Sequence, residues 1–256
     1  MSNFQDKDRL LESELKALTL NYMLEKGFLS VDDVISNEFL LKSSARRADI
    51  VISRNDELWA VEVKSEADSL TRLDGQVSAY LDCFDKVIVV SASKHVSHVL
   101  QMVPKEVAVW EVRGSRIVVV QRGRKRIQNC TKSLTSMLKL PKLRSLLKKY
   151  DFNLESRKRK HLEQLVTQHI SLKCLRKAVL DEFNSKYSLT SKVFFESLNG
   201  QRVRSEDLEE LSVYKNPNIV ILDHEEELTK MLAVFDNLAL SSQGKHNYQE
   251  ATCETP

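Results

Sequence analysis

Glycine and proline are scarce in this sequence, which has 6 Gly and 4 Pro among its 256 residues. Because flexible linkers are rich in these residues, we do not expect long flexible segments between domains. No apolar run approaches the roughly 20 residues that a membrane-spanning helix needs. The first residues also lack the basic-then-apolar layout of a secretory signal. We therefore expect a cytoplasmic protein that does not interact with membranes.

Cysteine is also sparse, and its spacing excludes two further classes of protein. The four cysteines lie far apart and form no CxxC pair. Neither a structural zinc site nor a disulfide framework is therefore expected. His95 and His98, three residues apart, could form a metal-binding pair, but histidines on a loop or helix surface are the favoured interpretation.

Charge is distributed unevenly along the chain. Residues 122–160 contain fourteen Lys or Arg and two acids, a net charge of +12, so the rest of the chain carries −9 of the overall +3. A basic block of this size favours a polyanionic partner, first of all a nucleic acid. The alternative is a set of solvated helix faces.

Hydrophobic periodicity divides the chain into a mixed α/β part and a helical part. The expected helices cover residues 10–25, 68–84 and 95–102, and the expected strands cover 34–40, 48–53, 58–64, 86–91, 107–112 and 116–120. Asp68 or Ser69 is the expected N-cap of the second helix. The continuous apolar run at 86–91 is typical of a buried parallel strand.

The pattern changes after Arg122, where Leu-rich and Lys-rich helical sequence begins and extends to about residue 211. We place a domain boundary near residues 122–130. The expected organisation is a domain at 1–122, a basic and mostly helical region at 123–240, and a polar, disordered tail at 241–256. Within the second region, a short apolar run at 218–222 precedes a helix at about 225–240.

The two runs on either side of Asn55 and Asp56 predict a β-hairpin. Asn and Asp tolerate the left-handed backbone that a two-residue hairpin turn requires. If Arg54 pairs with Glu57, the register places Asp49 opposite Glu62, at a Cβ separation of roughly 5 Å. Two carboxylates so close repel each other unless a cation lies between them.

Lys64 lies two residues beyond Glu62 and therefore points to the same face of its strand. Mg²⁺, or Mn²⁺, would suit two carboxylates because it binds a few protein oxygens, waters and substrate phosphates. A bound metal polarises a phosphodiester and acidifies water, and Lys64 could orient that water or stabilise the developing charge. The alternative is that Asp49 pairs with Arg46 or Arg47 while Glu62 and Lys64 face solvent.

These residues resemble the motif of the PD-(D/E)XK nuclease superfamily. The match rests on Asp49, on Glu62-Val63-Lys64, and on the order helix, three strands, helix, strand over roughly residues 8–92. Ala48 stands where many members have proline. The resemblance implies an α/β fold with a mixed sheet, a restriction-endonuclease-like αβββαβ core. It also implies that Asp49, Glu62 and the Val63 carbonyl bind the metal and that Lys64 is catalytic.

Further residues extend the resemblance. Gln76 and Tyr80 form a Q-x-x-x-Y pattern similar to that of RecB-like nucleases, where this helix borders the active site; a core-edge tyrosine beside a surface glutamine is the alternative. Members often carry an acid on the first helix, for which Glu14 is the better candidate here and Glu12 lies on the other flank. Glu38, on the first strand, is a weaker candidate.

The chain also resembles a bacterial and phage family of small nuclease-like proteins, in which the same R-R-A-D and E-x-K segments precede a basic helical C-terminal region. We expect a metal-dependent nuclease that acts on DNA, with RNA as a second possibility and the oligomeric state left open. The alternatives are a non-catalytic nucleic-acid-binding or regulatory protein on the same fold, and a protein-interaction module. The candidate phosphate contacts are Arg46, Arg47, Lys142, Arg144, Lys148, Lys149, Arg157, Lys158, Arg159 and Lys160.

Overall fold

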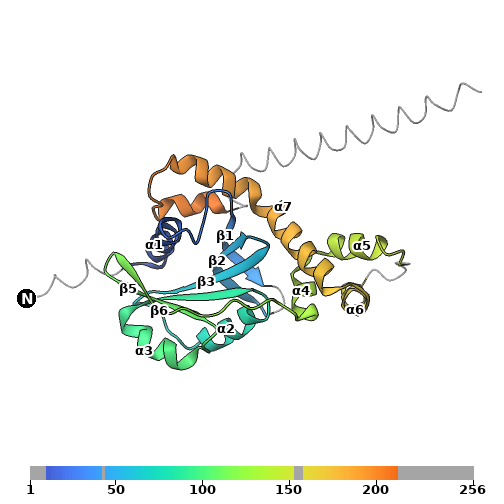
Figure 1. Ribbon diagram of the computed structural model, residues 1–256, viewed down its shortest axis with the longest axis horizontal. Coiled ribbons are helices and arrows are strands. Elements are labelled where there is room, and N and C mark those ends of the chain that lie inside the picture. The colour runs from blue at the N-terminus through green and yellow to red at the C-terminus, as the bar shows by residue number, and fades with distance from the viewer. Residues whose placement is uncertain (1–9, 42–43, 153–157, 213–256) are drawn as a thin grey trace, which may run out of the picture. The chain divides into compact units, whose positions relative to one another are not determined.

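A computed structural model describes residues 10–41, 44–152 and 158–212 of the chain (Figure 1). Residues up to Ser212 group into one compact unit, and the second unit begins at Val213. The predicted strand at 218–222, the helix at 225–240 and the tail from 241 all lie outside the described residues. The domain boundary expected near residues 122–130 stays a prediction.

The described part contains a six-stranded mixed sheet and a series of helices (Figure 1). The first half consists of α1 (Glu12–Glu25), β1 (Val34–Leu41), β2 (Arg46–Arg54), β3 (Glu57–Lys64), α2 (Leu73–Leu81), β4 (Lys86–Ala92), α3 (Ser93–Met102), β5 (Ala108–Arg113) and β6 (Arg116–Gln121). The second half consists of α4 (Thr131–Met137), α5 (Leu140–Lys148), α6 (Arg159–His169), α7 (Leu172–Leu198) and a 3₁₀ helix, η1 (Glu206–Leu211). The predicted mixed α/β fold with a helical C-terminal region is confirmed.

The strands follow one another across the sheet in chain order, β1 to β6. β1, β2 and β3 are antiparallel, β4 and β5 continue the sheet in parallel with β3, and β6 returns antiparallel to β5. The run at 86–91 does form a buried parallel strand, since residues 87–92 of β4 are all buried. Its burial on both faces explains why its sequence is continuously apolar.

Helices cover both faces of the sheet, with α1 and the end of α7 on one side and α2 and α3 on the other (Figure 1). Alternate residues such as Ile50, Ile52, Val61 and Val63 share a hydrophobic core with residues of α1 and α7. Because side chains alternate along a strand, Glu62 points away from that core, toward the α2 layer. In the second half of β3, Val61 and Val63 therefore face the core, while Glu62 and Lys64 face the other layer.

Helix α2 begins at Leu73, after the N-cap Arg72, rather than at the predicted cap Asp68 or Ser69. Asp68 has a different partner: its Oδ2 accepts hydrogen bonds from Ser65 N at 2.7 Å and from Ser65 Oγ at 2.6 Å. This local turn satisfies the Asp68 carboxylate without a helix. The predicted start of α2 was therefore wrong by about one turn.

The long helix α7 ties the helical region to the sheet at two points. Ser191 Oγ lies 2.8 Å from Ile35 N and 3.0 Å from Ile35 O, on strand β1. Near the other end of α7, Arg176 pairs with the buried Asp85 at 2.7 Å, and Asp85 also accepts the Leu58 amide of β3 at 2.9 Å. These contacts fix α7 against both β1 and the start of β4.

In the part of the chain that the structure describes, no helix is both long and apolar enough to span a membrane.

Candidate active site

The hairpin between β2 and β3 has the predicted turn and register. Asn55 and Asp56 have positive φ angles of 48° and 60°, as a two-residue turn of the left-handed type requires. Arg54 pairs with Glu57, and the same register continues to the pair Ile50 and Val61. The ladder ends there, so Asp49 and Glu62 at the next position are not paired through their backbones, although their carboxylates interact electrostatically.

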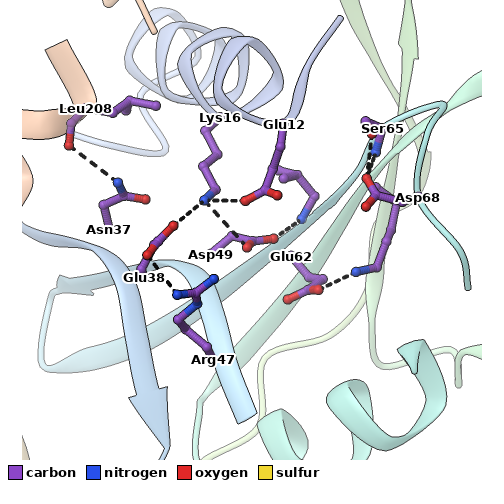
Figure 2. Close-up of polar contacts among 12 residues, drawn as sticks. Glu12, Lys16, Asn37, Glu38, Arg47, Asp49, Glu62, Ser65, Asp68 and Leu208 are labelled. Atoms are coloured by element: carbon purple, nitrogen blue, oxygen red, sulfur yellow. Dashed lines mark hydrogen bonds and ion pairs between the residues drawn. The ribbon is translucent and has the colours of Figure 1, made fainter. Parts of the chain in front are cut away.

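At that position the two strands separate. Beyond Ile50, β2 continues to pair with β1, and beyond Val61, β3 continues to pair with β4. The Asp49 side chain lies in the gap, where its Oδ2 accepts the Val63 amide at 2.7 Å. The sheet therefore opens where the candidate ligands meet, and Asp49 replaces a backbone partner for Val63 (Figure 2).

Three side chains that were each predicted to belong to the site form hydrogen bonds with the Glu62 carboxylate. Its Oε1 accepts from Lys64 Nζ and from Gln76 Nε2, each at 2.5 Å, and its Oε2 lies 2.8 Å from the Tyr80 hydroxyl. Glu62 is 2% exposed, so these contacts are shielded from water. The Q-x-x-x-Y pattern thus places both of its polar residues on the carboxylate, and Tyr80 is not merely a core-edge residue.

The Tyr80 hydroxyl also lies 2.7 Å from the Arg47 carbonyl oxygen. One hydroxyl proton cannot serve both acceptors at once, so Tyr80 can exchange its donor between Arg47 and Glu62. Burial, together with the negative charge of Glu62, raises the pKa of Tyr80, so the phenol stays protonated at physiological pH. Tyr80 is a donor here and not a base.

The pKa of Asp49 is raised from 3.8 to about 7. Burial is the main cause and the charge of Glu62 is the second, while Lys16 and the Val63 amide act in the opposite direction. A carboxyl with this pKa sits beside a like charge in a poorly solvated position. Such perturbed acids concentrate at functional sites, and a divalent cation would offset the repulsion directly.

Lys16 of α1 is a member of this site that the sequence analysis missed. Its buried ammonium lies 2.7 Å from Glu12 Oε1, 3.7 Å from Glu38 Oε1 and 3.7 Å from Asp49 Oδ1 (Figure 2). Glu38 also pairs with Arg47 at 3.0 Å and has a left-handed backbone, with φ 60°. The signal was a lysine between the apolar residues Leu15 and Ala17, on the inward side of a helix.

The structure corrects the choice of acid on the first helix. Glu14 Oε2 accepts a hydrogen bond from Leu11 N at 2.7 Å, so this exposed carboxylate satisfies a free amide at the start of α1. Glu12, on the flank that we set aside, reaches the site through Lys16. The physical reason is that a free helix N-terminus attracts a carboxylate three residues into the helix.

Asp49 and Glu62 are the residues that could hold a hard divalent cation, which would then keep most of its water. Among the described residues, no group of three or more His, Cys, Asp or Glu side chains could hold a metal ion, so His95 and His98 of α3 belong to no such group. Asp49 and Glu62 offer two carboxylates, and Mg²⁺ commonly binds through one or two carboxylates with waters and substrate oxygens. One amide oxygen beside them, Gln76 Oε1, is buried without a hydrogen-bond partner. The Val63 carbonyl remains a predicted ligand.

The predicted phosphate contacts fall into two groups. Arg46 and Arg47 lie at the start of β2. The Arg46 guanidinium packs against Gly75 of α2, where an added Cβ would lie 2.8 Å from Arg46 Nη2. In the helical region, α5 contains Lys142, Arg144 and Lys148 and ends at its C-cap Lys149, and Lys158 and Lys160 flank the first residue of α6.

Arg159 has an internal role instead. It pairs with Glu163 at 2.6 Å and donates to the carbonyl oxygens of Ser136 and Leu138, at 3.2 and 3.0 Å, near the end of α4. Its guanidinium therefore holds α4 to α6, and the expectation that it contacts phosphate stays a prediction. Arg157 lies outside the described residues.

Comparison with known proteins gives a family and one curated relative. The family model described as bacteriophage P4 protein cII matches residues 5–212. Protein cII of Enterobacteria phage P4 is 32% identical over 214 residues, which is 82% of this chain and 80% of that protein. Among solved structures, the SPO1766 protein of unknown function from Silicibacter pomeroyi aligns with 60% of this chain and 100% of its own, at 16% identity and a TM-score of 0.35. A TM-score this low does not show that the two proteins share a fold.

Proposed function

The chain belongs to the family of bacteriophage P4 protein cII, and for this member we propose metal-dependent hydrolysis of phosphodiester bonds in DNA. The observation that carries the proposal is the convergence of Lys64, Gln76 and Tyr80 on Glu62, beside Asp49 in the opening between β2 and β3. The proposal includes a restriction-endonuclease-like core of the PD-(D/E)XK type, supported by the order α1, β1, β2, β3, α2, β4.

Asp49 and Glu62 would hold the cation, which supplies charge to the scissile phosphate and acidifies a water when bound. Gln76 and Tyr80 fix the orientation of the Glu62 carboxylate, so the ligand is in place before substrate arrives. Lys64 shares Glu62 Oε1 with Gln76 in the absence of substrate. The Lys64 ammonium, which lies on Glu62 Oε1 beside the proposed metal position, would orient the attacking water or neutralise the developing charge.

The basic residues would position the DNA backbone. Arg46 and Arg47 flank the opening of the sheet, while the lysines of α5 and α6 form a second basic segment on the helical region. Contacts between these side chains and phosphates orient a duplex or a single strand without reading its sequence. Binding should therefore weaken steeply as salt rises.

The test is cleavage of plasmid and single-stranded DNA with Mg²⁺ or Mn²⁺. Wild type should cleave, Asp49→Ala should show no cleavage, and Lys64→Ala should lose about 10²–10⁴-fold in rate. Lys26→Ala is the matched control, because Lys26 follows the end of α1 and its described side-chain contacts are with Glu25 and the ring of Tyr22. Cleavage that survives both Asp49→Ala and Lys64→Ala would reject the proposal.

A second candidate is a non-catalytic DNA-binding protein on the same fold. The observation that favours it is that each carboxylate oxygen of Asp49 and Glu62 already has a donor or cation from the chain itself. Calorimetry with Mg²⁺ separates the two candidates. Absence of metal binding, together with salt-dependent DNA binding, would favour the second.

A further inference from the structure

Gly75, the third residue of α2, occupies a position where the backbone does not require glycine. Its φ angle is not positive, and glycine inside a helix costs stability relative to other residues. The nearest atoms to a Cβ added at this position are Nη2 and Cζ of the Arg46 guanidinium, at 2.8 and 3.5 Å. The missing side chain of Gly75 therefore provides the space in which the Arg46 guanidinium lies.

The Arg46 guanidinium forms no hydrogen bond and no ion pair with the residues that the structure describes. Its N–H donors form a planar fork, which matches the oxygens of a phosphate group. Arg47, the next residue in the chain, differs, because its Nη1 pairs with Glu38 Oε2 at 3.0 Å (Figure 2). Of these two arginines, Arg46 is therefore the one whose donors are available to a ligand.

The guanidinium also lies at the edge of the candidate active site. Gln76 directly follows Gly75 and donates to Glu62 Oε1 at 2.5 Å. Tyr80, about one turn further along α2, lies 2.8 Å from Glu62 Oε2 and 2.7 Å from the Arg47 carbonyl oxygen. The chain neighbours of the guanidinium's two contacting residues, on α2 and on β2, thus belong to the hydrogen-bonded network around Glu62.

We propose that Arg46 binds a backbone phosphate of the DNA strand at this site, and that Gly75 is a positioning residue for its guanidinium. The inference rests on the proposed function and deepens it by naming the residue that contacts the phosphate and the residue that positions it. A bidentate contact between guanidinium and phosphate orients the strand without reading its bases. Arg47 has a structural role instead, because Glu38 and Tyr80 already engage it.

The experiment measures binding of a short fluorescein-labelled DNA duplex to the full chain by fluorescence anisotropy, at several salt concentrations and with Ca²⁺ in place of Mg²⁺. Arg46→Met should weaken binding roughly 10–100-fold, because one charged phosphate contact is lost, and should reduce the slope of log affinity against log salt by about 1. Arg47→Met should cost less affinity than Arg46→Met. Arg116→Met is the matched control, because it removes an exposed arginine from β6, at the other edge of the sheet, and it should bind as wild type does.

Gly75→Leu tests the positioning role, because its side chain fills the space of the guanidinium. It should weaken binding nearly as much as Arg46→Met does, and the double variant should bind no more weakly than Arg46→Met alone. Leucine favours a helix over glycine, so Gly75→Leu should unfold at no lower urea concentration than wild type. If it does not fold, Gly75→Ala, whose Cβ would lie 2.8 Å from Arg46 Nη2, carries the same expectation of weaker binding.

The outcomes separate the inference from the proposed function. Wild type that does not bind the duplex at low salt would overturn both together. Wild-type binding that Arg46→Met leaves unchanged, or that Arg47→Met weakens as much, would overturn the inference alone, since the cleavage assay tests hydrolysis separately. Losses from Gly75→Leu and Arg46→Met that add in full would overturn the positioning role, because Gly75 would then act through a different contact.

Discussion

Replacing Asp49 with Asn should make the protein more stable at pH 8 but not at pH 4, when metal is absent. The Asp49 pKa is raised from 3.8 to about 7 by burial and by Glu62, so the folded protein holds a proton that the unfolded chain releases. Asn resembles the protonated carboxyl in shape and carries no charge. The variant therefore removes the cost of ionising this position.

The sign follows from proton linkage. Below pH 4 both states of wild type are protonated at Asp49, and the residue contributes no difference. As pH rises from about 4 to 7, the unfolded chain ionises first and the folded state loses about 1.4 kcal/mol of stability per pH unit. The pKa shift from 3.8 to about 7 then corresponds to a loss of roughly 4 kcal/mol in unfolding free energy above pH 7. Solvent screens this effect little, because the Asp49 side chain is only 14% exposed.

The assay is urea unfolding followed by the fluorescence of Trp59 and Trp110, at each pH from 4 to 8 with a chelator present. The difference in unfolding free energy between Asp49→Asn and wild type should grow with pH and level off above 7. Asp56→Asn is the control, because this exposed residue lies in the turn of the same hairpin. A difference that does not change with pH would refute the reasoning.

Three further substitutions test other contacts of the fold and site. Tyr80→Phe removes the hydroxyl that reaches Glu62 at 2.8 Å, and should lower the free energy of unfolding by about 1–2 kcal/mol in urea titrations; an unchanged value would mean that this contact is not formed in solution. Arg176→Met leaves the buried charge of Asp85 without its cation and should cost about 3 kcal/mol, measured by thermal melting, with Asp85→Asn in the same chain restoring part of the loss; no loss in the single variant would contradict this. Asp56→Gly should stabilise by about 0.5–1 kcal/mol because φ is 60° at this position, and a loss of stability in the same urea assay would argue against a left-handed turn.

The hairpin could be predicted from sequence because its information is local. Two residues that tolerate positive φ, flanked by alternating apolar positions, determine both the turn and the register as far as Ile50 and Val61. Asp49 and Glu62 follow directly after this pair, and their charges interact. Gln76 and Tyr80 could be predicted for a similar reason, since two residues that are four positions apart on a helix lie on the same face. Only the direction of that face had to be confirmed by the structure.

The contacts of Lys16 could not be predicted in the same way. They depend on where α1 lies relative to β1 and β2, which is a matter of packing between distant segments, and a lysine beside an apolar stripe usually extends to solvent. The separation of β2 from β3 after Ile50 is likewise set by their outer neighbours, β1 and β4. Glu14 was misassigned because helix-face reasoning ignored the free amide at the helix start, which attracted its carboxylate.

The hydroxyl of Ser191 has a consequence for the behaviour of the protein at high concentration. β1 is an outermost strand, and its exposed backbone groups would otherwise offer a template on which another molecule could add a strand. The Ser191 hydroxyl accepts a hydrogen bond from the Ile35 amide and donates one to the Ile35 carbonyl. These two backbone groups near the start of β1 are therefore occupied and less able to pair with another strand. Part of the protection of this edge against strand addition thus comes from a serine that lies 156 residues away in the chain.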